Sequence, residues 1–149
     1  MALDFASSTE IQAAWKYLDG NVPAPKSAYE AHEVIEGGLP AAMLRHFRDK
    51  VRALSDKTWA QIVDVSLSQV KELRKKSKLS VRVSSQLVLF AVLLARAEDV
   101  FGGREEALRW FDGEQMALSG RRPIDLLDTF VGANLVARTL TQIDRGVYI

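Results

Sequence analysis

Few side chains in this sequence have the chemistry of an enzyme active site. The chain contains no cysteine, so it has no thiol nucleophile, thiolate metal site or disulfide, and it has only two histidines. Its carboxylate pairs, Glu105-Glu106 and Asp125/Asp128, lie near predicted helix ends, where the helix dipole stabilises negative charge. Gly102-Gly103 lacks the spacing and the preceding strand of a phosphate-binding loop. We therefore expect no catalytic residue, no metal site and no cofactor.

The clearest chemical signal is a run of basic side chains between Lys71 and Arg82. These twelve residues contain six Lys or Arg and one acidic residue, a net charge of +5, whereas the whole chain of 149 residues carries only +1. The total is small because residues 1–38 carry −4 and residues 101–149 carry −1, against +6 for residues 39–100. Dense positive charge on one segment is typical of proteins that neutralise nucleic-acid phosphates.

The helices that would present this charge are predicted at residues 55–76. Ser55 can cap a first helix, and Ser66 can cap a second one, in which Gln69 completes the capping-box pattern. The turn between them is short and contains Asp64 where glycine is usual, and aspartate tolerates a left-handed conformation better than most residues. Apolar residues fall where two such helices must contact each other: Trp59, Ala60, Val63, Val65, Val70 and Leu73. Two capped helices joined by a short turn are the layout of a helix-turn-helix.

The second helix of a helix-turn-helix enters the DNA major groove. We expect its outward side chains to reach base edges, while the basic residues around it neutralise phosphates and make binding strongly salt-dependent. The predicted DNA-binding residues are Ser68, Gln69, Lys71, Glu72, Arg74, Lys75 and Lys78, with Lys76 and Arg82 as further phosphate contacts. A solvated helix face is the alternative explanation of such a charge run. Here, however, the charge coincides with the helix that would enter the groove.

Apolar periodicity predicts an all-α fold around one long central helix. Apolar residues recur at three- and four-residue spacing, and no stretch alternates with the period of a strand. The central helix is expected from about Ser84 to Phe101, because its middle is apolar nearly all round. Its longest apolar run, Leu87–Ala95, has nine residues, far fewer than the roughly 20 that span a membrane. Met1–Ser8 does not resemble a signal peptide, so we expect a cytoplasmic protein without membrane contact.

Start and stop signals predict further helices on both sides of the central one. They cover Ser7 to Gly20, Ser27 to Ile35, Leu39 to Leu54, Arg104 to Asp112, Pro123 to Phe130, and Val131 to Arg145 with Gly146 as its stop signal. The expected organisation is an N-terminal helical extension (residues 1–38), a helix-turn-helix domain (39–82) and a C-terminal helical domain (83–149).

The sequence from about residue 97 onward is similar to a known domain. It reads AEDVFGGREEALRWF, then ALSGRRPIDLLDT, then GANLVARTLTQIDRGVYI. The order and spacing of Val100-Phe101-Gly102, Trp110, Leu118–Gly120, Pro123–Leu127 and Gly146-Val147-Tyr148 resemble the C-terminal domain of Xre/MbcA/ParS-type antitoxins, the partners of RES-domain toxins. With the helix-turn-helix that precedes it, the resemblance spans about two thirds of the chain.

The resemblance implies a toxin partner and a mode of binding. Antitoxins of this family hold the toxin through this domain, and their C-terminal segment lies at the toxin's active-site cleft. RES toxins deplete cellular NAD, so a blocked cleft would neutralise them. Carried onto this sequence, the toxin contacts are Arg138, Gln142, Arg145, Gly146, Val147, Tyr148 and Ile149. Without the resemblance, the apolar chain end could equally fold back on its own core or be held by a partner.

The family also represses its own operon through its helix-turn-helix, usually as a dimer. These features predict a non-enzymatic, all-α antitoxin that binds a RES-domain toxin and double-stranded operator DNA, as a homodimer. The alternative is a stand-alone helix-turn-helix transcriptional regulator whose C-terminal domain dimerises or binds a small effector. The role of residues 1–38 is left open, since they lie outside the resemblance.

Overall fold

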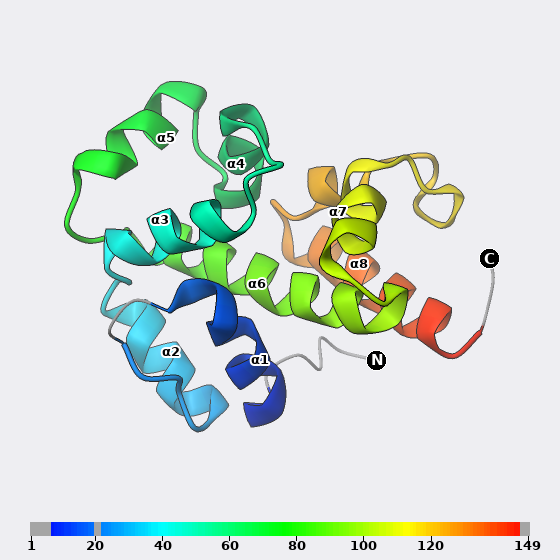
Figure 1. Ribbon diagram of the computed structural model, residues 1–149, viewed down its shortest axis with the longest axis horizontal. Helices are drawn as coiled ribbons and strands as arrows, with labels where there is room; N and C mark the ends of the chain where they lie inside the picture. The colour runs from blue at the N-terminus through cyan, green and yellow to red at the C-terminus, as the bar shows by residue number, and fades with distance from the viewer. Residues whose placement is uncertain (1–6, 20–21, 147–149) are drawn as a thin grey trace.

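The computed structural model describes residues 7–19 and 22–146, and within these ranges the chain is helical (Figure 1). This part of the chain forms eight α-helices and three short 3₁₀ helices, with no β-strand, which confirms the predicted all-α fold. None of these helices is long and apolar enough to cross a membrane. The elements are α1 (Ser8–Leu18), α2 (Ala28–Glu36), α3 (Ala41–Lys50), α4 (Asp56–Val63), α5 (Leu67–Glu72), η1 (Leu73–Lys75), α6 (Val81–Phe101), α7 (Arg104–Asp112), η2 (Met116–Leu118), η3 (Pro123–Leu126) and α8 (Phe130–Asp144).

Helix α6 lies at the centre of the molecule, and helices from both halves of the chain pack on it (Figure 1). The Ser80 hydroxyl caps α6 by accepting a hydrogen bond from the Val83 N–H at 3.1 Å, so the helix begins three residues before its predicted start at Ser84. It ends at Phe101 as predicted, because Gly102 adopts a φ of 86°, in the left-handed region that favours glycine. Most of its side chains are buried, so one helix positions both halves of the molecule.

Five aromatic rings link helices that are far apart in the sequence. Tyr17 stacks on Phe47 with ring centroids 5.0 Å apart, and Phe47 meets Trp59 at 5.0 Å and Phe90 at 5.5 Å. Phe90 in turn contacts Phe111 edge-on at 5.4 Å. Each such pair stabilises the fold by about 0.5–1.5 kcal/mol beyond its buried area. Because the rings come from α1, α3, α4, α6 and α7, the N-terminal helix shares one core with the rest of the chain.

Most of the predicted helix bounds agree with the structure. Helices α1, α2 and α7 begin and end within two residues of their predicted positions. Helix α3 is shorter than predicted, since it ends at Lys50, and Val51 and Leu54 therefore follow the helix. Both still pack on the core, Val51 fully buried and Leu54 partly.

The segment before α8 differs from its prediction. A helix was expected from Pro123 through Phe130, but the structure has a 3₁₀ helix that ends at Leu126. A new helix begins after this point because the Thr129 hydroxyl caps α8, accepting a hydrogen bond from the Gly132 N–H at 2.9 Å. Gly132 also lies very close to this segment, since a Cβ atom at its position would be 2.0 Å from the Leu126 carbonyl oxygen. The start of α8 therefore depends on a glycine at this position.

Candidate functional site

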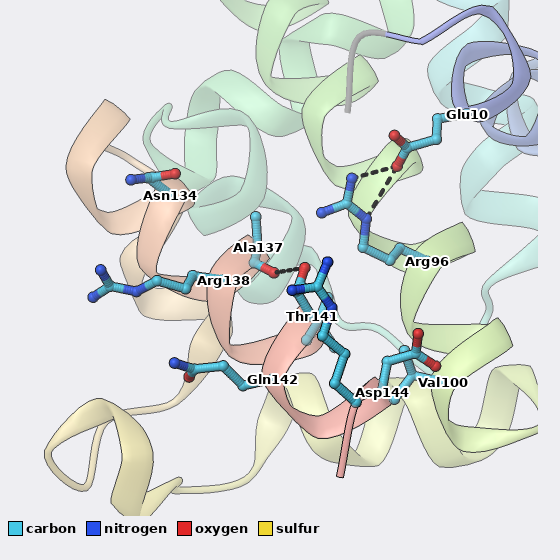
Figure 2. A pocket seen from close by; sticks show the side chains of 11 residues that line it. Glu10, Arg96, Val100, Asn134, Ala137, Arg138, Thr141, Gln142 and Asp144 are labelled. Atoms are coloured by element: carbon cyan, nitrogen blue, oxygen red, sulfur yellow. Dashed lines mark hydrogen bonds and ion pairs between the residues drawn. The ribbon is translucent and has the colours of Figure 1, made fainter. Parts of the chain in front are cut away.

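Helix α8 forms one wall of a groove of about 570 Å³ (Figure 2). The opposite wall consists of Glu10 from α1 and of Arg96 and Val100 from α6. The α8 wall is lined by Asn134, Ala137, Arg138, Leu140, Thr141, Gln142 and Asp144, with Arg145 directly after the helix. The lining of the groove thus combines apolar side chains with polar ones and with charges of both signs.

An ion pair between Glu10 and Arg96 shapes the wall opposite α8. The Arg96 Nε donates to Glu10 Oε2 at 3.0 Å, and a second guanidinium N–H donates to the same oxygen. Ser7 and Glu10 also have the spacing of a capping box. Ser7 does cap α1, since its hydroxyl accepts a hydrogen bond from the Glu10 N–H. The Glu10 carboxylate, however, also pairs with a residue that lies 86 positions further along the chain.

The structure brings together three of the predicted toxin-binding residues. Arg138, Gln142 and Arg145 all line the groove, because a spacing of four residues places the first two on one face of α8 and Arg145 follows directly after the helix. Within the described part of the chain none of their side chains forms a hydrogen bond or ion pair, so all three are available to a partner. Gly146 follows with a φ of 76°. Val147, Tyr148 and Ile149 lie outside the described residues.

Helices α4 and α5 are capped and joined as the sequence predicts. The Ser55 hydroxyl accepts a hydrogen bond from the Thr58 N–H at the start of α4. Ser66 and Gln69 form a reciprocal capping box at the start of α5, in which the Ser66 N–H donates to Gln69 Oε1 at 2.8 Å. Asp64 adopts the left-handed conformation with φ 57° and ψ 53°. The two helices and their turn therefore have the predicted local structure.

The residues predicted to bind DNA are exposed, although several already have partners. Ser68, Lys71 and Lys78 are exposed, and no salt bridge involves either lysine within the described residues. Glu72 and Lys75 form a loose ion pair at 3.7 Å, and Gln69 uses its carbonyl oxygen in the capping box.

Three arginines near this surface pair with carboxylates. Arg74 approaches Asp56 at 3.5 Å, and Arg48 also pairs with Asp56. The hydrogen bond from Arg48, together with the charges of Arg48 and Arg74, lowers the pKa of the Asp56 carboxyl from its ordinary value. Arg82, predicted as a phosphate contact, donates to Asp64 Oδ2 at 3.0 Å and to the Asp128 carbonyl oxygen at 2.8 Å. It therefore connects the turn after α4 to the segment before α8.

A buried amide makes a second connection between these regions. Gln86 of α6 is 4% exposed, and its Nε2 donates to the carbonyl oxygens of Ile62 at 3.2 Å and Leu127 at 2.7 Å. Ile62 lies in the last turn of α4, where carbonyl groups have no partner within the helix. The sequence analysis did not single out Gln86, since nothing local indicates which distant carbonyls it meets.

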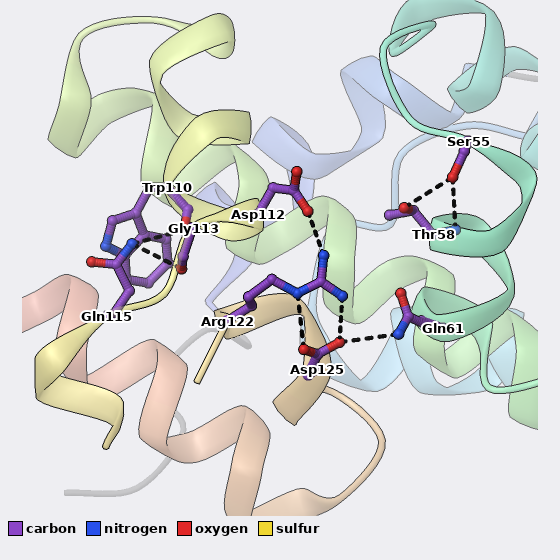
Figure 3. A network of polar contacts seen from close by, with 9 residues as sticks. All are labelled: Ser55, Thr58, Gln61, Trp110, Asp112, Gly113, Gln115, Arg122 and Asp125. Carbon is purple, nitrogen blue, oxygen red and sulfur yellow. Dashed lines mark hydrogen bonds and ion pairs between the residues drawn. The ribbon is translucent and has the colours of Figure 1, made fainter. Parts of the chain in front are cut away.

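A surface network completes the contact between α4 and the C-terminal half (Figure 3). The Arg122 guanidinium donates to both oxygens of Asp125 and to Asp112, and these hydrogen bonds raise its pKa above the ordinary value. Gln61 of α4 donates to the same Asp125 carboxylate at 3.1 Å. Helix α4 is therefore fixed to the C-terminal half through buried and exposed hydrogen bonds alike.

Comparison with known proteins relates the part of the chain that contains α8 to a known family. Residues 96–146 match the family described as the antitoxin Xre/MbcA/ParS C-terminal toxin-binding domain. The chain is 29% identical over 126 residues to Antitoxin Xre of Pseudomonas putida, an alignment that covers 85% of this chain and 78% of the relative. It is also 29% identical over 125 residues to the Prs ADP-ribosylating antitoxin of a Sphingobium species, with 77% of this chain and 78% of the relative covered.

The match between this helical domain and a toxin-binding family supports the class of a toxin-neutralising antitoxin. The family match over residues 96–146 and the similarity to two antitoxins over most of the chain support an antitoxin of the Xre/MbcA/ParS type. The expectation that it is not an enzyme agrees with this assignment, because the matched family binds toxins. The predicted resemblance is therefore confirmed.

Proposed function

We propose that this antitoxin neutralises a RES-domain toxin by closing the toxin's active site with its own C-terminal segment. The observation that supports the proposal best is the position of Arg138, Gln142 and Arg145. Arg138 and Gln142 lie on α8, Arg145 follows the helix directly, and all three line the groove. All three also fall within the segment matched by the toxin-binding family.

The chemistry of this end of the chain suits a cleft in a partner protein. Arg138 and Arg145 offer planar guanidinium groups that can form paired hydrogen bonds with carboxylates or phosphates. Val147, Tyr148 and Ile149 add two aliphatic side chains and an aromatic one. Apolar residues of this kind contribute most when a partner covers them completely. The arginines would therefore orient the toxin, and the last three residues would fill its cleft.

Deletion of residues 147–149 tests the proposal. Cells that express the toxin with the truncated antitoxin should stop growing, whereas cells with the full-length antitoxin should grow. Tyr29→Ala is a matched control, because Tyr29 is 75% exposed on α2, at the opposite end of the molecule from α8 (Figure 1). This control should retain full protection. Normal growth of cells that carry the truncation would contradict the proposal, provided that both antitoxins accumulate equally.

We also propose that α4 and α5 form a helix-turn-helix that binds the antitoxin's own operator as a homodimer and represses the operon. The support is the capped geometry of the two helices together with the exposed basic side chains on α5 and η1. Ser68, Lys71 and Lys75 would face the major groove, with Gln69 and Glu72 beside them. Arg74 and Lys78 would contact phosphates.

The combined substitution Lys71→Ala and Lys75→Ala tests this assignment. Gel-shift affinity for the operator should fall, and the slope of log affinity against log salt should become shallower by roughly 1 to 2. A matched control is Lys16→Ala with Lys26→Ala, which removes two exposed lysines from the N-terminal part of the chain. An operator affinity and salt slope equal to those of the control would rule out α5 as the recognition helix.

A further inference from the structure

A second cavity, of about 380 Å³, lies between α3 and the segment formed by α5 and η1. Its volume is within the range of small-molecule sites, which is about 300–1,000 Å³. Four arginines line it, and they are Arg45, Arg48, Arg52 and Arg74. Its apolar lining includes Leu44, Leu54, Val70 and Leu73. We refer to it as the arginine pocket.

The arginine pocket has an excess of positive charge. Asp49 is the only acidic residue in its lining, and Asp56 reaches Arg48 and Arg74 from outside it. Even with both carboxylates counted, the four arginines leave a net charge of +2. Within the described residues, the Arg45 side chain forms no ion pair or hydrogen bond, and Arg52 donates only to the Asp49 carbonyl oxygen. Two of the four guanidinium groups are therefore free to bind an anion.

Arg48 is the third arginine of the pocket with an unpaired N–H group. Its Nη2 pairs with Asp56, but its Nη1 is buried without a hydrogen-bond partner. A buried N–H group of a charged side chain is costly when it is left unpaired, so such groups usually have an acceptor, which can be an ion or a ligand. Because Arg48 lines the pocket together with three other arginines, an anion bound there would offer this atom an acceptor and would be attracted by all four charges.

We propose that the arginine pocket binds a small phosphorylated molecule that also carries an apolar or aromatic group. Guanidinium groups match the geometry of a phosphate, with which they form paired, charge-assisted hydrogen bonds. The leucine and valine side chains would cover the apolar part of the ligand, which inorganic phosphate lacks. The ligand would be held between α3 and α5–η1, at a site separate from the toxin-facing groove.

Calorimetric titration of the full-length antitoxin with three probes tests the proposal in the absence of DNA. The probes are adenosine monophosphate, inorganic phosphate and adenosine. Adenosine monophosphate should bind at least 10-fold more tightly than either of the others, because only it supplies both the phosphate and the ring. Arg45→Ala combined with Arg52→Ala should weaken this binding at least 10-fold. Neither arginine forms a side-chain ion pair within the described residues, so the variant should keep its circular dichroism spectrum.

A matched control removes two arginines from the C-terminal half, Arg109→Ala with Arg121→Ala, and should leave the affinity unchanged. Equal losses in both double variants, or no preference for the nucleotide over inorganic phosphate, would overturn the proposal, since either result indicates nonspecific attraction to positive charge. The phosphate groups of operator DNA are the other possible ligands of these arginines. Weaker operator binding by the Arg45/Arg52 variant, with no binding of adenosine monophosphate at millimolar concentration, would assign the pocket to DNA and would also overturn the proposal.

Discussion

Replacement of Gln86 by leucine tests how α4 is held against the C-terminal half. Leucine has a similar size, so the substitution removes the amide with little change in packing. The carbonyl oxygens of Ile62 and Leu127 would lose the hydrogen bonds of 3.2 and 2.7 Å that this amide donates. Both residues are buried, which limits the access of water to the two oxygens. Gln86→Leu should therefore destabilise the protein.

The expected magnitude follows from the cost of a buried polar group without a partner. Each such group costs about 1–3 kcal/mol, and the more apolar leucine offsets part of the loss. We expect the free energy of unfolding to fall by about 2–4 kcal/mol. For a domain of this size the melting temperature should fall by roughly 6 to 12 °C.

Urea denaturation followed by circular dichroism measures this difference. Gln61→Leu is a matched control, because Gln61 donates one exposed hydrogen bond to Asp125 between the same two regions. Its loss should cost less than about 1 kcal/mol. If Gln86→Leu were as stable as the control, the buried amide would not be the main connection between α4 and the C-terminal half, and the argument from unpaired carbonyls would be wrong.

Three further changes test individual features of the fold. Gly132→Ala should cost about 2 kcal/mol in an unfolding titration, because its Cβ would overlap the Leu126 carbonyl oxygen, whereas Gly37→Ala, with no contact closer than 3.7 Å, should be nearly neutral. Ser66→Ala should cost about 1 kcal/mol, since it removes the cap of α5, and an unchanged urea midpoint would contradict that role. Asp56→Asn should alter the pH dependence of stability. Because the pKa of Asp56 is lowered in the folded state, its carboxylate stabilises the protein at pH values above its ordinary pKa of 3.8, and this contribution is lost as the pH falls further. The stability difference between wild type and Asp56→Asn should therefore be largest near neutral pH and shrink in acid, and a constant difference would refute the assignment.

The helices and their caps could be predicted because the signals are local. Ser55, Ser66 and Gln69 lie within three residues of the backbone groups that they cap, and Asp64 occupies the left-handed position that the short turn requires. Local signals also predicted most of the last helix, on which Arg138 and Gln142 lie, but the choice of these residues as toxin contacts came from the family resemblance. The helix predictions needed only the geometry of a helix and of its ends.

The groove and the connections between the two halves could not be predicted, because they depend on residues far apart in the sequence. Glu10 has the spacing of a capping-box residue, yet its carboxylate binds Arg96 on another helix. Arg82 belongs to a basic run, yet it donates to Asp64 and to the Asp128 carbonyl oxygen. Neither partner is indicated by spacing or composition, since each contact arises only when α6 packs against its neighbours.

The affinity of the purified antitoxin for a cognate RES-domain toxin tests the central claim most directly. Arg138→Glu combined with Arg145→Glu reverses two charges on the groove, whereas Arg109→Glu combined with Arg121→Glu reverses two exposed charges elsewhere in the C-terminal half. We expect the first variant to bind at least about 10-fold more weakly than wild type, because charged hydrogen bonds contribute about 1.5–3 kcal/mol each. The second should bind like wild type. Wild-type affinity in the groove variant would contradict the assignment of this surface to the toxin.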